Sequence, residues 1–175
     1  KDVELKISKL IVTPVATHDQ PLLNSTGVHE SYRLRTIVQI ETSDGYTGAG
    51  ETSADRSSEI EANRAWIEGA DPRQMTRARR EWKGSPEAWA AVETAMLDAA
   101  SKQAGLPLCD YMGGRARDRV EWAAYLFYKF ADENGQGEIA TGETLDPEGC
   151  VRQAEAFVDR YGFKTLKIKG GFFHP

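Results

Sequence analysis

Several features that identify common classes of protein are missing from this sequence. Its 175 residues include only two cysteines, Cys109 and Cys150, which lack the spacing of a metal site and are expected to be reduced. No apolar run is long enough to span a membrane, and no signal-peptide pattern opens the chain. The net charge of −5 is opposite to the basic footprint of a nucleic-acid-binding domain. We therefore expect a cytoplasmic globular protein that binds neither membranes nor nucleic acids.

The first fifty residues carry the pattern of a small antiparallel sheet. A loose apolar alternation over residues 3–15 predicts a first strand. Residues 32–41 and 46–51 predict two more strands, joined by the turn signal Ser43-Asp44-Gly45. Residues 16–31 between the first two strands show no periodicity, and a connection of this length is usually functional or disordered.

Residues 56–105 have helical patterns. Ser57 or Ser58 is suited to begin a helix that reaches Ile67, and Asp71-Pro72 is suited to begin another. The strongest pattern follows Ser85-Pro86, where apolar residues recur at steps of three and four up to a terminating Gly105. The many alanines of this last helix predict close packing, so we interpret it as core.

The last third of the sequence predicts a strand, a helix and a second strand. Residues 119–126 form an apolar run typical of a buried strand, and Asp146-Pro147 begins a helix that ends at Gly162. Residues 163–169 form the second strand, which is expected to lie parallel to the first.

The predicted fold is therefore an α+β capping domain, a three-stranded antiparallel sheet plus helices, over residues 1–115. Residues 116–175 then form the first βαβ unit of an incomplete α/β TIM-like barrel. A single βαβ unit leaves strand edges unpaired. We expect the chain to be the first part of a longer protein, the alternative being that it pairs with something else.

The final strand contains two lysines, Lys167 and Lys169, on one face and Leu166 and Ile168 on the other. The lysines of a surface strand would face water. In a parallel barrel they would point into the mouth, where catalytic residues gather, while Leu166 and Ile168 packed against outer helices. Burial and mutual repulsion lower the pKa of lysines, as a proton-abstracting base requires.

Segments along nearly the whole chain resemble the enolase superfamily, in its mandelate-racemase-like branch, and within it the glucarate dehydratases. The matching segments lie in the same order and at the same spacing. They are residues 15–19 and 22–29, Gly48-Ala49-Gly50-Glu51, residues 93–98, Tyr125-Leu126-Phe127, and residues 161–171 with their Lys-x-Lys-Gly-Gly ending.

This resemblance implies a magnesium-dependent acid-sugar dehydratase, which removes the proton next to a carboxylate and then loses water. It implies that Lys169 is the base and that Lys167 contacts the developing charge. Asn24 and His29, on a loop that covers the substrate, and Tyr125 would bind the distal polyol or carboxylate. The Mg²⁺ ligands and a second base are expected on later barrel strands, beyond residue 175.

Other interpretations stay open. His29 could be a solvated loop histidine, Asn24 a turn cap and Tyr125 a core residue. The region between Trp82 and Trp89 is shorter than in glucarate dehydratases, so the acid sugar could be a different one. Racemisation or cycloisomerisation, a Schiff-base lysine in a barrel, and a truncated module without catalysis are the alternative functions. We also expect a homo-oligomer.

Overall fold

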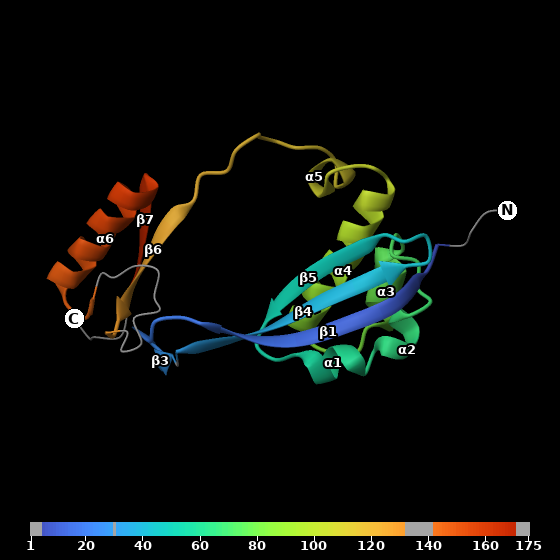
Figure 1. Ribbon diagram of the computed structural model, residues 1–175, viewed down its shortest axis with the longest axis horizontal. Coiled ribbons are helices and arrows are strands. Elements are labelled where there is room, and N and C mark those ends of the chain that lie inside the picture. Colours follow the sequence, from blue (N-terminus) through green and yellow to red (C-terminus); the bar gives the residue numbers. More distant parts are fainter. Residues whose placement is uncertain (1–4, 30, 132–141, 171–175) are drawn as a thin grey trace. The chain divides into compact units, whose positions relative to one another are not determined.

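The computed structural model describes residues 5–29, 31–131 and 142–170. The chain divides into two compact units, Lys1–Thr17 with Leu34–Ala116, and His18–Arg33 with Arg117–Pro175. Figure 1 follows the chain through both units. Within the described ranges, no helix is long and apolar enough to cross a membrane.

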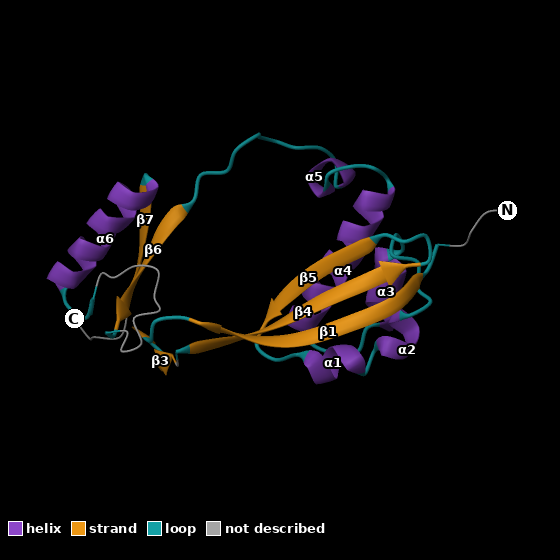
Figure 2. Cartoon of the chain, in the orientation of Figure 1, coloured by secondary structure: helices purple, strands orange, loops and turns teal. Residues whose placement is uncertain are grey.

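The first unit contains the predicted three-stranded sheet (Figure 2). Its strands are β1 (Ile7–His18), β4 (Tyr32–Thr42) and β5 (Thr47–Ser53), in the order β1-β4-β5. The turn signal at Gly45, which has φ +91°, joins β4 to β5 as an antiparallel pair. β1 continues through Pro14 and ends at His18, three residues beyond its predicted end at residue 15.

Helix α4 (Pro86–Gln103) packs directly against β5. Ser85 begins the helix as predicted, its side chain accepting a hydrogen bond from the Ala88 amide at 3.2 Å. A Cβ atom built on Gly50 would lie 2.0 Å from the Ala91 carbonyl oxygen, and one on Gly48 would lie 2.0 Å from that of Ala95. Backbone therefore approaches backbone, and only glycine in the strand and small residues in the helix permit this distance.

Short helices surround this core, and the sequence predicted their limits less well. They are α1 (Ser57–Glu61), α2 (Arg64–Ile67), α3 (Met75–Glu81) and α5 (Leu108–Tyr111). The single helix expected from Ser57 to Ile67 is interrupted at Asn63. The helix expected at Asp71-Pro72 begins only at Met75, because the Asp71 carboxylate accepts the Arg73 amide at 2.9 Å in a turn.

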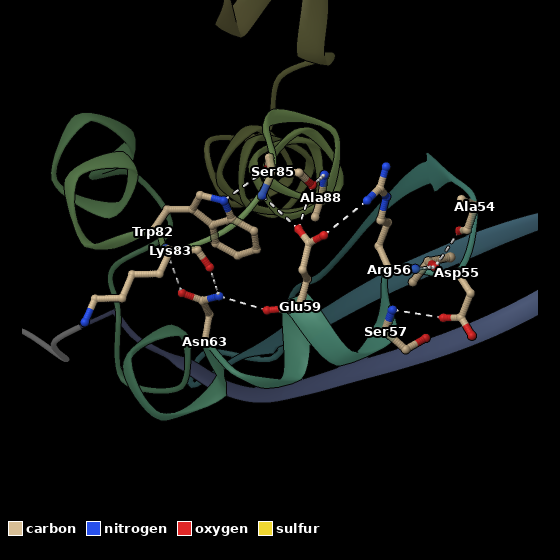
Figure 3. A network of polar contacts seen from close by, with 11 residues as sticks. Ala54, Asp55, Arg56, Ser57, Glu59, Asn63, Trp82, Lys83, Ser85 and Ala88 are labelled. Carbon is tan, nitrogen blue, oxygen red and sulfur yellow. Dashed lines mark hydrogen bonds and ion pairs between the residues drawn. The ribbon is translucent and has the colours of Figure 1, made fainter.

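A polar network joins α1 to the start of α4 (Figure 3). The Glu59 carboxylate accepts hydrogen bonds from the Ser85 amide at 2.8 Å and its hydroxyl at 2.6 Å, and pairs with Arg56 at 3.2 Å. The buried Asn63 amide donates to the carbonyl oxygens of Glu59 and Lys83, each at 2.8 Å. The break between α1 and α2 thus frees Asn63 to tie three segments together.

The second unit contains the predicted βαβ unit. Strand β6 (Ala123–Lys129), helix α6 (Pro147–Tyr161) and strand β7 (Thr165–Lys169) follow each other, and β6 pairs with β7 in parallel, as expected. Asp146 caps α6 by accepting the Gly149 amide at 2.6 Å, and Gly162 ends it at φ +68°. β6 begins and ends later than the predicted 119–126.

Within the stretch 16–31, which showed no periodicity, residues 22–29 form a hairpin that joins the second sheet. Its strands β2 (Leu22–Asn24) and β3 (Gly27–His29) are antiparallel, and β2 also pairs with β6. The sheet order is β3-β2-β6-β7. Strands of three residues are too short to produce a detectable alternation, which is why the sequence did not reveal them.

The face of this sheet nearest α6 is only partly covered. Ala124 and Leu126 are 3% and 2% exposed, but Leu166 and Ile168 are 41% and 68% exposed. The expectation that Leu166 and Ile168 pack against helices is therefore not met within the described residues. On a surface strand with its lysines toward water, Leu166 and Ile168 would face a core. That core is not seen within the described residues either, although Lys167 is exposed.

We predict that Gly50→Ala lowers the free energy of unfolding of the first unit by about 3 kcal/mol, because the new methyl would overlap the Ala91 carbonyl. Urea unfolding measures the change. The control is Ala49→Ser, on the exposed face of β5, which should change stability by less than about 0.5 kcal/mol. Equal stability of the Gly50→Ala protein and the wild type would refute the backbone contact.

We also predict a pH-dependent contribution from Glu59. Hydrogen bonds from Ser85 lower the pKa of Glu59 below its usual 4.5, with Arg56 assisting. The ionised form therefore stabilises the folded state by about 1 kcal/mol at neutral pH, and this contribution is lost as pH falls below 4.5. Unfolding of wild type and Glu59→Gln should differ at pH 7 and converge in acid. Glu81→Gln, at an exposed position, is the control, and a pH-independent difference would contradict the mechanism.

Candidate active site

The register of β6 and β7 places both lysines beside aromatic rings. Tyr125 pairs with Lys167, and Phe127 pairs with Lys169. Directly paired residues point to the same face of a sheet, and so do alternate residues of one strand. These four side chains therefore share one face, opposite the face that α6 covers at Ala124 and Leu126.

The hairpin adds its polar side chains to the same face. Leu22 of β2 pairs with Lys129 of β6 on one side and with His29 of β3 on the other. Asn24 lies two residues after Leu22 and so points the same way. All five residues that the sequence predicted for the site thus lie on one face of the four-stranded sheet: Asn24, His29, Tyr125, Lys167 and Lys169.

The lysine ammonium groups lie over a small aromatic surface. The rings of Tyr125 and Phe127 are 4.3 Å apart, centroid to centroid. Lys167 Nζ is 4.4 Å from the Tyr125 centroid, and Lys169 Nζ is 5.5 Å from that of Phe127 and 6.0 Å from that of Tyr125. These separations allow cation–π attraction, which holds the ammonium groups in place without neutralising them. A carboxylate on this face would meet the side chains of both lysines, neither of which forms an ion pair with another described residue.

Asn24 organises the hairpin and contacts the histidine. It is 4% exposed, and its Oδ1 accepts hydrogen bonds from the Thr26 amide at 2.8 Å and the Thr26 hydroxyl at 2.6 Å. Its Nδ2 contacts His29 Nε2. The turn-capping interpretation of Asn24 is therefore realised, and the same side chain also lies against His29. Contact with substrate stays a prediction for both residues.

The environment of His29 favours the neutral imidazole. The Arg33 guanidinium contacts His29 Nδ1, and because arginine can only donate, that nitrogen must accept. Burial lowers the pKa of His29 below its usual 6.5, and the charges of Arg33 and Lys169 lower it further. Arg33 is held by Asp19, whose carboxylate lies 3.6 Å away. A neutral imidazole is suited to hydrogen bonding with hydroxyl groups.

Sequence reasoning missed two members of this face, Phe127 and Lys129, and one residue that contacts it, Arg33 of β4. The signal for the first two was present, since Tyr125-x-Phe127-x-Lys129 continues the alternation of the strand. The predicted strand stops at Leu126, so the alternation was not followed. Arg33 gave no signal, because its contact with His29 arises only in the folded structure.

The side chains on this face do not form a magnesium site. Magnesium prefers oxygen ligands, usually carboxylates. The face presents ammonium, guanidinium, imidazole, amide and phenol groups. Within residues 5–29, 31–131 and 142–170, no three histidine, cysteine or acidic side chains are clustered as metal ligands would be.

A cavity of about 400 Å³ lies in the first unit. Trp66, Ala78 and Gly69 line it, together with charged side chains. None of the predicted site residues lines this cavity.

Comparison with known proteins defines the class. Residues 6–113 match the family described as mandelate racemase / muconate lactonizing enzyme, N-terminal domain. The chain belongs to this family of the enolase superfamily.

Among individual relatives, a probable glucarate dehydratase of Streptomyces coelicolor is 38% identical over 98% of this chain and 47% of its own length. A D-gluconate dehydratase of Thermoproteus tenax is 28% identical over 75% of this chain and 27% of its own length. The chain thus spans about half, or less, of the curated relatives it matches.

Solved structures agree with this placement. An enolase from Thermobispora bispora, complexed with magnesium and formate, superimposes with a TM-score of 0.88 at 38% identity, over 98% of this chain and 47% of that one. An enolase from Mycobacterium smegmatis, complexed with tartrate, gives 0.85 at 38% identity, over 98% of this chain and 45% of that one. The capping sheet with its helices, and the parallel strands that begin a barrel, are thus the fold of this family.

We predict that the His29 imidazole titrates below pH 6.5 and that Arg33→Gln raises its midpoint, because removing the guanidinium removes a repulsive charge. NMR titration of the imidazole Cε1–H resonance measures both values. The control is Arg35→Gln. Arg35 lies on the same strand as Arg33 but forms an ion pair with Glu51 at 3.2 Å, so its removal should leave the His29 midpoint unchanged. A wild-type midpoint at or above 6.5 would overturn this description of the site.

Proposed function

We propose that the protein is an acid-sugar dehydratase of the hydro-lyase type, in which this chain supplies the base and part of the substrate-binding surface. The observation that carries the proposal is the shared face: two lysines on β7 lie on the same side of one sheet as the polar hairpin residues. Kinship with proteins named glucarate and gluconate dehydratases supports the reaction class. A glucarate-like acid is the proposed substrate.

The proposed chemistry begins at Lys169. Its neutral amine takes the proton next to the substrate carboxylate, and the electron pair of the broken C–H bond moves into the carboxylate to form an enediolate. The Lys167 ammonium, one pair along β7, lies where it can stabilise the added negative charge. The neighbouring β-hydroxyl then leaves as water, taking the proton that Lys169 carries, and the electron pair of the enediolate forms a carbon–carbon double bond.

Asn24, His29 and Tyr125 are proposed to bind the rest of the acid sugar. A neutral imidazole and an amide offer both donors and acceptors, which suit the alternating hydroxyls of a polyol. Magnesium enters the proposal through relatives solved with it. The described residues offer it no ligand set, so the steps assigned here use the side chains of this chain alone.

The proposal also assigns the two parts of the chain. Residues 1–115 are proposed to be the capping domain and residues 116–175 the first βαβ unit of the barrel. The hairpin at residues 22–29 would then be a segment of the capping domain that reaches the barrel strand β6, with which it pairs.

We predict that Lys169→Ala in the full-length protein lowers exchange of the substrate α-proton with deuterated solvent by at least about 1,000-fold, since the assigned base is removed. Exchange is followed by NMR over a panel of aldarates and aldonates with magnesium present. Lys164→Ala is the control, because Lys164 pairs with Glu121 on the surface, both side chains being more than 70% exposed.

Three outcomes separate the alternatives. Retained exchange in Lys169→Ala would show that Lys169 is not the base that removes the α-proton. Exchange without loss of water would favour racemisation or cycloisomerisation on the same lysine pair. A covalent adduct trapped by borohydride with a keto-acid substrate would replace proton abstraction by a Schiff base on lysine.

A further inference from the structure

Lys129 is a partly buried lysine that the proposed reaction does not use. It ends β6 on the face that carries Tyr125 and Phe127, at the carboxyl end of the strand. Lys129 pairs with Leu22 of β2, and Leu22 pairs in turn with His29 of β3. Lys129 therefore lies between the lysine pair and the hairpin, where the far end of an elongated substrate would lie.

The backbone at Lys129 is fixed by buried polar side chains. Thr144, which is fully buried, accepts the Lys129 amide on its hydroxyl at 3.1 Å and donates its own amide to the Lys129 carbonyl at 2.8 Å. Gln153, 1% exposed, donates to the same hydroxyl at 3.1 Å and to the Phe127 carbonyl at 3.2 Å, and accepts the Phe127 amide at 3.1 Å. The end of β6 is thus held before any ligand arrives, which lowers the entropic cost of binding.

Among the described residues, no acidic side chain forms an ion pair with Lys129. Within the described part of the chain, no carboxylate lies within 4.0 Å of its ammonium, and burial lowers the pKa of Lys129. The Asp19 charge opposes that shift from a longer distance, but this carboxylate is already paired with Arg33. Within the described residues, the basic side chains of Lys129, Lys167, Lys169 and Arg33 lie on or beside this face, and Asp19 pairs with Arg33.

The spacing of these cations suits a molecule with an acid group at each end. Lys169 pairs with Phe127, and Lys129 is two residues further along β6, about 7 Å at the usual rise of a strand. The two carboxyl carbons of an extended six-carbon diacid are separated by five staggered carbon–carbon bonds, about 6 Å.

Resting on the function proposed above, we propose that Lys129 binds the second carboxylate of a dicarboxylic acid sugar and so selects aldarates over aldonates. The carboxylate next to the abstracted proton is left to the Lys167 ammonium, beside the base Lys169. The ammonium of Lys129 supplies the charge-assisted hydrogen bond at the other end, and a neutral hydroxymethyl group there would leave it without a counter-charge.

The test compares one aldarate with the aldonate of the same configuration in the full-length protein. Lys129→Met should lower kcat/KM for the aldarate by about 10- to 100-fold, the range expected for loss of a hydrogen bond to a charged group, and change the aldonate value by less than about threefold. Lys129→Arg, which keeps the charge, should restore most of the loss. Lys164→Met removes an exposed lysine and is the matched control.

Equal losses for both substrates in Lys129→Met, or no loss for either, would overturn the assignment. A direct binding measurement makes the result independent of turnover: the six-carbon aldarate should raise the titration midpoint of the Lys129 ammonium in an NMR experiment, and the aldonate of the same configuration should raise it much less. If wild type dehydrates neither acid sugar but the aldarate still shifts Lys129, the proposed function fails and the carboxylate site stands. If the aldarate leaves Lys129 unchanged, the site itself is refuted.

Discussion

The register of β6 with both of its neighbours is the constraint on which this site depends. A slip of one residue against β7 would turn either the lysines or the aromatic rings to the opposite face, because the side-chain period of a strand is two. A slip against β2 would do the same to Asn24 and His29. The single face therefore exists only because two independent backbone pairings, one parallel and one antiparallel, agree on the same strand.

The position of β6 is also fixed at the carboxyl end of the strand, by hydrogen bonds from outside the regular strand pairing. Gln153 reaches from α6 and presents both a donor and an acceptor to Phe127, as the backbone of a further strand would. Thr144 pairs with Lys129 through its backbone. Buried polar groups are costly unless fully paired. Here Gln153 and Thr144 bond to each other and to the backbone of Phe127 and Lys129, whose side chains lie on the site face. Helix α6 thus positions the site through the backbone rather than through contact with substrate.

The sequence predicted the features that local chemistry determines. Asp146 and Gly162 as the limits of α6, Ser85 as the cap of α4, and the parallel pair that follows from strand–helix–strand were all readable, because each depends on a few neighbouring residues. The hairpin at residues 22–29 was not, because its strands are stabilised by β6, a hundred residues away in the chain. The interruption at Asn63 was missed for the same reason, since the partner of its side chain at Lys83 is distant in sequence.

The distinction between local chemistry and contacts distant in the sequence also applies to the site. The five predicted residues came from a family resemblance, and the structure adds that they share a face, which no spacing in the sequence states. Gathering cations there opposes folding unless something offsets their repulsion. The rings of Tyr125 and Phe127 offset part of it, and Asp19 offsets part through Arg33. The remainder is a positive potential on this face. Under the proposed function an acid substrate would neutralise this potential on binding, so that the repulsion between the basic side chains would become affinity for an anion.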